Sequence, residues 1–200
     1  SYLKAIELEP SFAVAYNNVG SILLDLGNAK ESVKYLEHAV KLEPQYADAH
    51  YNLARTYQQG LAQIERATQL YQNTLAIAPQ FQKAQWNLSL CHLTLGNFTQ
   101  GWQEYEVRKK LANVPKDTVR SYDVPEWLGD ADLAGKAVLL HAEQGMGDTL
   151  QFCRYAALVA ERGAKVLLQV QAPLVNVLAD VPGVQQMIRS EEHTFELQSH

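Results

Sequence analysis

Three prolines divide the first half of the chain into intervals of nearly equal length. Pro10 and Pro44 lie 34 residues apart, Pro44 and Pro79 lie 35 apart, and a short apolar stretch precedes each proline. Proline ends helices, because its ring removes a backbone donor and disfavours a helical residue before it. A fixed period of this length indicates one structural unit that recurs, each copy too small to bury its apolar face alone.

Aligning the intervals on the prolines brings further positions into register. A small residue recurs where two helices would approach closely: Gly20, Ala54 and Ser89. This pattern resembles the tetratricopeptide repeat, in which each unit is a pair of antiparallel helices. The resemblance covers two full units and a partial unit at either end. It predicts an α-helical tetratricopeptide array over residues 1–112.

An asparagine recurs at one position of the first helix in three successive units: Asn18, Asn52 and Asn87. A row of amides can hold an extended peptide, because each amide both donates to and accepts from a peptide backbone. The arrangement is similar to the asparagine ladder of the O-linked N-acetylglucosamine transferase repeats, which implies a polypeptide or protein partner on the concave face. The alternative is that each asparagine only links neighbouring helices.

Residues 113–135 break the helical period with prolines and glycines, which predicts a linker. Trp127 is its large apolar residue, and we expect it to fill the junction between the two halves. Asp130-Ala131-Asp132 has the DxD spacing that can hold a divalent cation against a diphosphate. Because it precedes the first strand instead of following a central one, we predict no metal site there.

Residues 136–188 alternate between strand and helix patterns, which predicts a truncated, Rossmann-like α/β domain with a parallel sheet. The apolar runs favour three strands and two helices: strands at 136–141, 165–170 and from 184, and helices at 149–162 and 173–180. A glycine turn, Gly145-Met146-Gly147, and then Asp148 follow the first strand. Ligands of α/β proteins bind at such a junction.

The dinucleotide-binding fingerprint does not fit this turn. Leu150 stands at the third glycine position, and Gln171 replaces the acidic residue that would hold a ribose. The region from about Trp127 to Ile188, and above all the run from His141 to Phe152, resembles instead the N-terminal half of glycosyltransferases with two Rossmann-like domains, of the heptosyltransferase type. It is still more similar to bacterial proteins that join tetratricopeptide repeats to such a domain. The pair Glu143-Gln144 departs from the heptosyltransferases, so a heptose donor is not implied.

This resemblance implies an inverting, metal-independent transfer from a nucleotide-sugar, with Asp148 as the general base. The acceptor or phosphate loop would comprise Glu143, Gln144, Gly145 and Gly147. The donor would bind mainly to a second domain, so we expect the fragment to be inactive alone. A structural alternative is that Asp148 and Gln151 form a capping box. A functional alternative is a non-enzymatic adaptor whose α/β domain is degenerate.

Composition limits the remaining classes. A net charge of −5 argues against a nucleic-acid surface, and no apolar run is long enough for a membrane span. The two isolated cysteines favour a reducing, cytoplasmic location. Ser1 lies within a helical pattern, so we expect preceding sequence to be missing. Residues 189–200 are similar to the translated read-through of a sequencing adapter, and we exclude them from the predicted fold.

Overall fold

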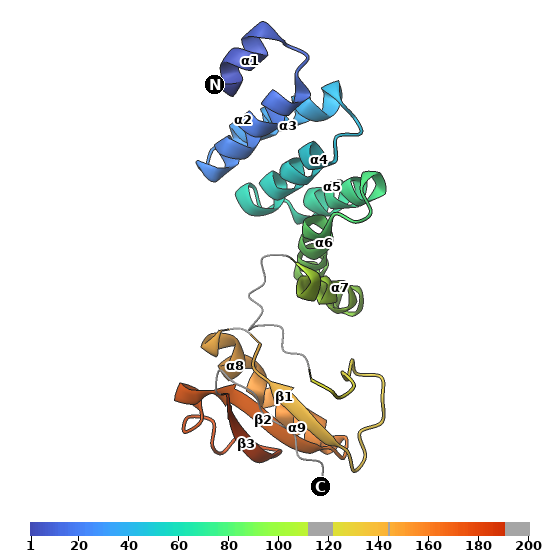
Figure 1. Ribbon diagram of the computed structural model, residues 1–200, viewed down its shortest axis with the longest axis vertical. Helices are drawn as coiled ribbons and strands as arrows, with labels where there is room; N and C mark the ends of the chain where they lie inside the picture. Colours follow the sequence, from blue (N-terminus) through green and yellow to red (C-terminus); the bar gives the residue numbers. More distant parts are fainter. Residues whose placement is uncertain (112–121, 144, 191–200) are drawn as a thin grey trace. The chain divides into compact units, whose positions relative to one another are not determined.

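The computed structural model describes residues 1–111, 122–143 and 145–190. The chain falls into two compact units, Ser1–Asn113 and Val114–His200. Figure 1 shows that the first unit is built from helices and the second from a small sheet with short helices. Residues 112–121, Gln144 and the last ten residues, which include most of the predicted adapter segment, lie outside the described residues.

The first unit is a series of helix pairs, as the proline period predicts. Its α-helices are α1 (Tyr2–Leu8), α2 (Ala13–Asp25), α3 (Ala29–Leu42), α4 (Ala47–Arg55), α5 (Ile64–Ile77), α6 (Gln82–Thr94) and α7 (Phe98–Tyr105). A 3-10 helix, η2 (Glu106–Lys110), continues α7. Each helix packs against the next, and α2 also packs against α4. This arrangement confirms the predicted helical array.

Proline and glycine set the helix ends. Helices α1, α3 and α5 each stop two residues before a proline of the repeat. Helix α2 ends before Gly27, whose φ of 80° is a left-handed conformation that glycine adopts without steric cost. The N–H of Asn28 there donates to the Leu23 carbonyl at 2.8 Å, which satisfies a terminal carbonyl of the helix.

The longer interval between Pro44 and Pro79 has a structural counterpart. A π-helix, η1 (Thr56–Gly60), follows α4, and the Leu61 N–H donates to the Thr56 carbonyl five residues earlier at 3.1 Å. A π-turn holds one residue more than an α-turn. The extra residue of the 35-residue interval therefore lies before α5, which starts 20 residues after Pro44, whereas α3 starts 19 residues after Pro10.

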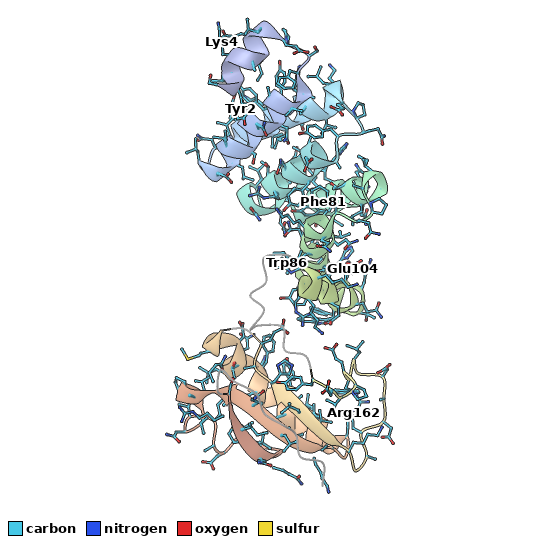
Figure 2. The ribbon with its side chains drawn as sticks, in the orientation of Figure 1. Tyr2, Lys4, Phe81, Trp86, Glu104 and Arg162 are labelled. Atoms are coloured by element: carbon cyan, nitrogen blue, oxygen red, sulfur yellow. The ribbon has the colours of Figure 1, made fainter. Side chains whose placement is uncertain are left out.

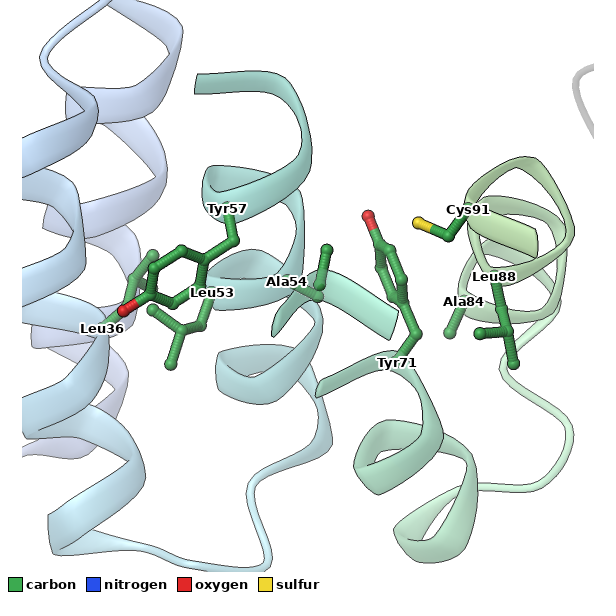
Figure 3. Packing of buried hydrophobic residues seen from close by; sticks show 9 residues of the cluster. Leu36, Leu53, Ala54, Tyr57, Tyr71, Ala84, Leu88 and Cys91 are labelled. Carbon is green, nitrogen blue, oxygen red and sulfur yellow. The ribbon is translucent and has the colours of Figure 1, made fainter. Parts of the chain in front are cut away.

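One hydrophobic cluster runs through α3 to α6 (Figure 3). It consists of Leu36, Leu53, Ala54, Tyr57, Ala67, Tyr71, Ala84, Leu88 and Cys91. The small residues at the aligned positions are needed because helices meet there: a Cβ on Gly20 would lie 2.5 Å from Leu36 Cγ. Neighbouring repeats thus share one core, which is how a repeat too small to fold alone becomes stable.

The second unit contains a three-stranded parallel sheet in the order β1 (Ala137–His141), β2 (Lys165–Gln171) and β3 (Val184–Ser190). This sheet confirms the predicted strand direction. Strand β3 extends two residues beyond the predicted limit at 188, into the segment assigned to the adapter. The complete Rossmann-like domain stays a prediction.

Two helix predictions in this unit need correction. The first helix begins at Met146 instead of Thr149 and comprises α8 (Met146–Phe152), η3 (Cys153–Tyr155) and α9 (Ala156–Glu161). Gly145 is its N-cap, because the Thr149 N–H already reaches the Gly145 carbonyl at 3.2 Å. The glycine turn is therefore mostly the first turn of a helix.

The second correction concerns residues 173–180. A 3-10 helix, η4 (Ala172–Leu174), and then turns replace the predicted α-helix. The Leu178 N–H donates to the Leu174 carbonyl at 2.9 Å, and both side chains are buried with Leu168 and Val170. One turn is enough to bury both leucines, so burial does not require a longer helix.

The sheet unit has a second cluster beside α9, formed by Leu133, Ala156, Val159, Ala164 and Val166. Trp127 packs against it, and Arg162 Cζ lies 5.0 Å from the Trp127 ring centroid. Trp127 therefore packs against the sheet unit's own core. Its predicted role at the junction between the halves stays a prediction. The tryptophan lies close enough in sequence to β1 to reach this local cluster.

Candidate functional site

The asparagine row, defined as Asn18, Asn52 and Asn87, lies on α2, α4 and α6. Asn52 Nδ2 donates to Asn17 Oδ1 at 2.9 Å, and Asn87 Nδ2 donates to the Tyr51 hydroxyl at 3.2 Å. Each of these amides thus bonds to the residue just before the row position in the preceding repeat. Asn18 makes no hydrogen bond to the described residues.

These bonds leave part of each amide unused. Asn17 uses both ends of its amide, since its Nδ2 also donates to the Tyr46 hydroxyl at 3.4 Å. The Oδ1 atoms of Asn52 and Asn87 accept no hydrogen bond from the parts of the chain that the structure describes. Two members of the row, Asn52 and Asn87, therefore link neighbouring repeats, as the alternative interpretation expects. The role of the row in peptide binding stays a prediction.

Sequence reasoning missed the partners of the row, Asn17 and Tyr51. The proline register does place both one residue before the row, so the signal was present. The register does not show how successive repeats are offset in space. This offset brings each amide to the residue just before the row position in the preceding repeat.

A groove of about 390 Å³ lies at the C-terminal end of the array. Its lining comes from α5, α6, α7 and η2: Leu75, Gln85, Leu88, Gln103, Glu104, Glu106, Val107 and Lys110. Beside it, His92 Nδ1 lies 2.6 Å from Glu104 Oε2, and this pair fastens α6 to α7. No residue of the asparagine row lines the groove, so it is separate from the row.

At the other candidate site, Asp148 occupies the third residue of α8 and is exposed. The capping-box prediction is wrong, because the N-cap is Gly145 and makes no side-chain cap bond. A Cβ on Gly145 would lie 3.8 Å from Asp148 Oδ2, so the carboxylate does lie beside the glycine. Asp148 is thus not part of a capping box, and its assignment as a base stays a prediction.

A polar cluster lies where β1 and β2 end. His141 pairs with Gln169 in the strand register. The Tyr122 hydroxyl donates to Gln169 Oε1 at 2.8 Å, and the Tyr122 ring centroid lies 5.2 Å from that of His141. Thr149, on α8, donates to Gln171 Oε1 at 2.9 Å. These bonds hold the first turn of α8 at the carboxyl edge of the sheet, where α/β folds bind ligands.

The other predicted loop residues lie around this edge. Glu143 is half-buried, Gly145 is exposed, and no atom lies within 4 Å of the place a Cβ would take on Gly147. Gln144 lies outside the described residues. In the described parts of the chain, no group of three or more metal-ligating side chains could hold an ion. In the DxD segment, Asp132 Oδ1 accepts the Ala134 N–H at 3.1 Å.

Comparison with known proteins identifies the helical unit. Residues 20–60 match a family model described as TPR repeat, and residues 1–34 match one described as tetratricopeptide repeat. YrrB, described as a TPR protein with an unusual peptide-binding site, superposes with a TM-score of 0.54 at 16% identity. That match covers 58% of this chain and 60% of YrrB. The helical unit is a tetratricopeptide-repeat array.

Two curated proteins extend the comparison. Protein FlbA of Caulobacter vibrioides is 26% identical over 195 residues, covering 88% of this chain and 32% of FlbA. Protein O-mannosyl-transferase Tmtc3 of Drosophila melanogaster is 30% identical over 79 residues, covering 40% of this chain and 8% of Tmtc3. The chain therefore spans about a third of the length of FlbA, and the matched segment is less than a tenth of Tmtc3. None of the helices in the described segments has the length and apolar character of a membrane span.

Proposed function

We propose that the tetratricopeptide array binds an extended polypeptide along the asparagine row. The observation that carries this proposal is that the amide oxygens of the half-buried Asn52 and the buried Asn87 accept no hydrogen bond from the described residues. The N–H group of each amide is bonded to the preceding repeat, which fixes the orientation of its oxygen. A fixed acceptor loses little side-chain entropy when a peptide N–H binds to it, so binding is favoured.

The test uses two variants that break the same inter-repeat bond from opposite sides. Asn52→Ala removes both the bond and the oxygen offered to the peptide. Asn17→Ala removes the bond but keeps the Asn52 oxygen. Peptides selected by display on the wild-type chain should bind Asn52→Ala about tenfold more weakly than Asn17→Ala, the loss expected for one hydrogen bond. Equal affinities for the two folded variants would refute the role of the row.

A second pair of variants repeats the design one repeat further on. Asn87→Ala removes the amide, whereas Tyr51→Phe removes only the hydroxyl that accepts from it. We expect Asn87→Ala to bind the selected peptides more weakly than Tyr51→Phe does. Circular dichroism of each variant checks that helicity is retained, so that a weaker affinity is not mistaken for unfolding.

For the sheet unit, we propose the acceptor-side half of an inverting, metal-independent glycosyltransferase. The polar cluster at the carboxyl edge favours this function, because it fixes α8 so that Asp148 stands on the first turn after β1. The partly matched Tmtc3 is named a protein O-mannosyl-transferase, which gives limited support to a glycosyltransferase function. Asp148 would take the proton of an acceptor hydroxyl whose oxygen bonds to the anomeric carbon, while the nucleotide leaves with the electrons of the donor bond.

In this proposal, Glu143, Gln144, Gly145 and Gly147 surround the acceptor, and a further domain of a longer cytoplasmic parent holds the nucleotide-sugar. Asp148→Asn in that parent should abolish turnover and leave donor binding unchanged. The 200-residue chain alone should show no turnover. Retained turnover in the variant would remove Asp148 from the reaction. A wild-type parent that binds no nucleotide-sugar would favour the adaptor function instead.

A further inference from the structure

The groove at the C-terminal end of the array lies where the last repeat departs from the pattern of the earlier two (Figure 2). Glu104, in the lining of the groove, is the seventh residue of α7, whereas the seventh residues of α3 and α5 are Tyr35 and Leu70. Leu70 packs against the hydrophobic cluster of the array, and the Tyr35 ring centroid lies 6.2 Å from that of Tyr16. A carboxylate in the last repeat thus replaces a packing contact of the earlier ones.

The two carboxylates in the lining are already engaged by the protein. Glu104 Oε2 lies 2.6 Å from His92 Nδ1, and Glu104 Oε1 accepts a side-chain amide N–H of α7 at 2.9 Å. One oxygen of Glu106 forms an ion pair with Arg108 at 2.8 Å, and the other forms one with Lys109 at 2.5 Å. All four carboxylate oxygens therefore have partners, and neither side chain is left to bind a cation of a ligand.

The groups that remain available in the lining are a cation, an amide and an apolar surface. Lys110 and Gln103 are exposed, and neither side chain makes an ion pair or a hydrogen bond to the described residues. The apolar surface comes from Leu75, Leu88 and Val107. In a chain whose net charge is −5, the unpaired charge in this groove is therefore positive.

We propose that this groove is a second docking site, for a polypeptide segment that carries an aliphatic side chain next to a carboxylate. The aliphatic side chain packs against Leu75, Leu88 and Val107. The carboxylate accepts from the Lys110 ammonium and the Gln103 amide. The volume of about 390 Å³ is at the lower end of the range for binding sites, about 300–1,000 Å³, and suits one or two side chains.

A basic segment fits this groove less well than an acidic one. Lys110 repels it, and each carboxylate oxygen of the lining already has a partner within the part of the chain that the structure describes. The site is also separate from the asparagine row, none of whose members lines the groove. Binding here therefore does not depend on the peptide binding proposed for the row.

A peptide library displayed on phage provides the probe. It is selected on the full 200-residue chain and counter-selected on Val107→Gln, which removes apolar surface from the groove without changing its charge. The enriched peptides should share a leucine, isoleucine or valine next to an aspartate or glutamate. Circular dichroism checks that Val107→Gln keeps its helicity. If it does not, counter-selection uses Lys110→Gln, because Lys110 is exposed and its loss leaves the core intact.

A matched pair of lysine variants tests the charge. Lys110→Gln removes the cation of the groove, and Lys30→Gln removes another exposed lysine, on α3. The enriched peptides should bind Lys110→Gln about three- to fivefold more weakly than wild type, the loss expected for one exposed ion pair, and should bind Lys30→Gln unchanged. Replacing the acidic residue of the peptide by its amide should weaken binding to wild type equally and to Lys110→Gln no further.

Each other outcome overturns the proposal. Enrichment of aliphatic–basic pairs would show that the groove takes a cation. No enrichment for wild type over Val107→Gln would show that the groove binds no peptide. Asn52→Ala should leave the affinity of the enriched peptides unchanged, and a loss there would place them on the row. Peptides that bind wild type and Val107→Gln alike but not Asn52→Ala would support the row alone, so the two sites fail independently.

Discussion

The two units of the chain bury their apolar residues in different ways. In the repeat array, one cluster extends from Leu36 to Cys91 through successive helices, and each helix packs mainly against its sequence neighbours. In the sheet unit, the core is divided into two smaller clusters. Apolar side chains of its helical segment stay about half exposed, among them Leu150, Tyr155 and Leu158. Local repetition completes a core within a short chain, whereas a parallel sheet requires cover from distant segments.

The largest effect should come from removing the central side chain of the repeat core. Tyr71 is fully buried, and its hydroxyl donates to Gln58 Oε1 at 2.6 Å. Tyr71→Ala should lower the free energy of unfolding of the array by about 3–5 kcal/mol, the range for a buried aromatic residue. Hydrogen-exchange mass spectrometry should show lost protection in α4 to α6 and none in β1 to β3.

The exposed Tyr2, at 46% of its accessible surface, is the control, and Tyr2→Ala should change little. If Tyr71→Ala also removed protection from the strands, the two units would not be independent. The comparison between them would then fail.

Two glycines with the same backbone conformation sharpen the contrast. Gly27 in the array and Gly183 in the sheet unit have φ angles of 80° and 81°. A Cβ on Gly27 would meet no atom within 4 Å, whereas one on Gly183 would lie 2.8 Å from the Ala157 Cα atom. Alanine at either position has the same left-handed strain, of about 1 kcal/mol. Gly183→Ala should lower the free energy of unfolding by about 2–4 kcal/mol in total, because the backbone at Ala157 must also move.

Chemical denaturation of both variants, followed by circular dichroism, measures this difference. Similar losses would mean that α9 and β3 are not closely packed. In that case the sheet unit would tolerate loose contacts more than its geometry suggests.

The sequence predicts the array more closely than the sheet unit, for a physical reason. Helix ends in the array follow from the three prolines of the repeat and from Gly27 and Gly96, both with a left-handed backbone. These residues act on the residues next to them. In the sheet unit, the start of α8 depends on whether Gly145 caps a helix or forms a loop. Glycine permits both, so only the surrounding structure decides.

The candidate sites show the same limit. The asparagine row was visible because it repeats, but its partners depend on how repeats are offset in space. The polar cluster at the sheet edge gave no local signal, since Tyr122 and Gln169 are 47 residues apart. Asp148 could be placed beside the sheet edge, yet whether it belongs to a capping box depends on a helix start that the sequence leaves open.

A smaller effect separates the two possible roles of the row. Asn87 is buried and bonded to Tyr51, whereas Asn18 makes no hydrogen bond to the described residues. Asn87→Ala should lower the free energy of unfolding of the array by about 1–2 kcal/mol, because the Tyr51 hydroxyl loses its donor. Asn18→Ala should leave stability within about 0.5 kcal/mol of wild type. Thermal unfolding measures both, and equal losses would show that Asn18 has a structural partner.

The smallest effect concerns the two cysteines, one in each unit. Burial in the repeat core raises the pKa of the Cys91 thiol to about 11. In the unfolded chain a thiol loses its proton near pH 8.5. Above that pH the unfolded chain loses the thiol proton more easily than the folded array does. The free energy of unfolding is therefore highest below pH 8.5 and falls as the pH rises toward the folded pKa. At pH 9.5 the loss should be about 1 kcal/mol.

The measurement compares denaturant unfolding of the array at pH 8 and pH 9.5 in wild type, Cys91→Ala and Cys153→Ala. Tyrosines also titrate in this range, but they are common to all three proteins, so only the difference between pH slopes is informative. Cys91→Ala should flatten the slope of the array, while Cys153→Ala, in the sheet unit, should not. Identical slopes in wild type and Cys91→Ala would show that the repeat core admits enough water to ionise the thiol. The contrast between a closed array and an open sheet unit would then be weaker than their packing indicates.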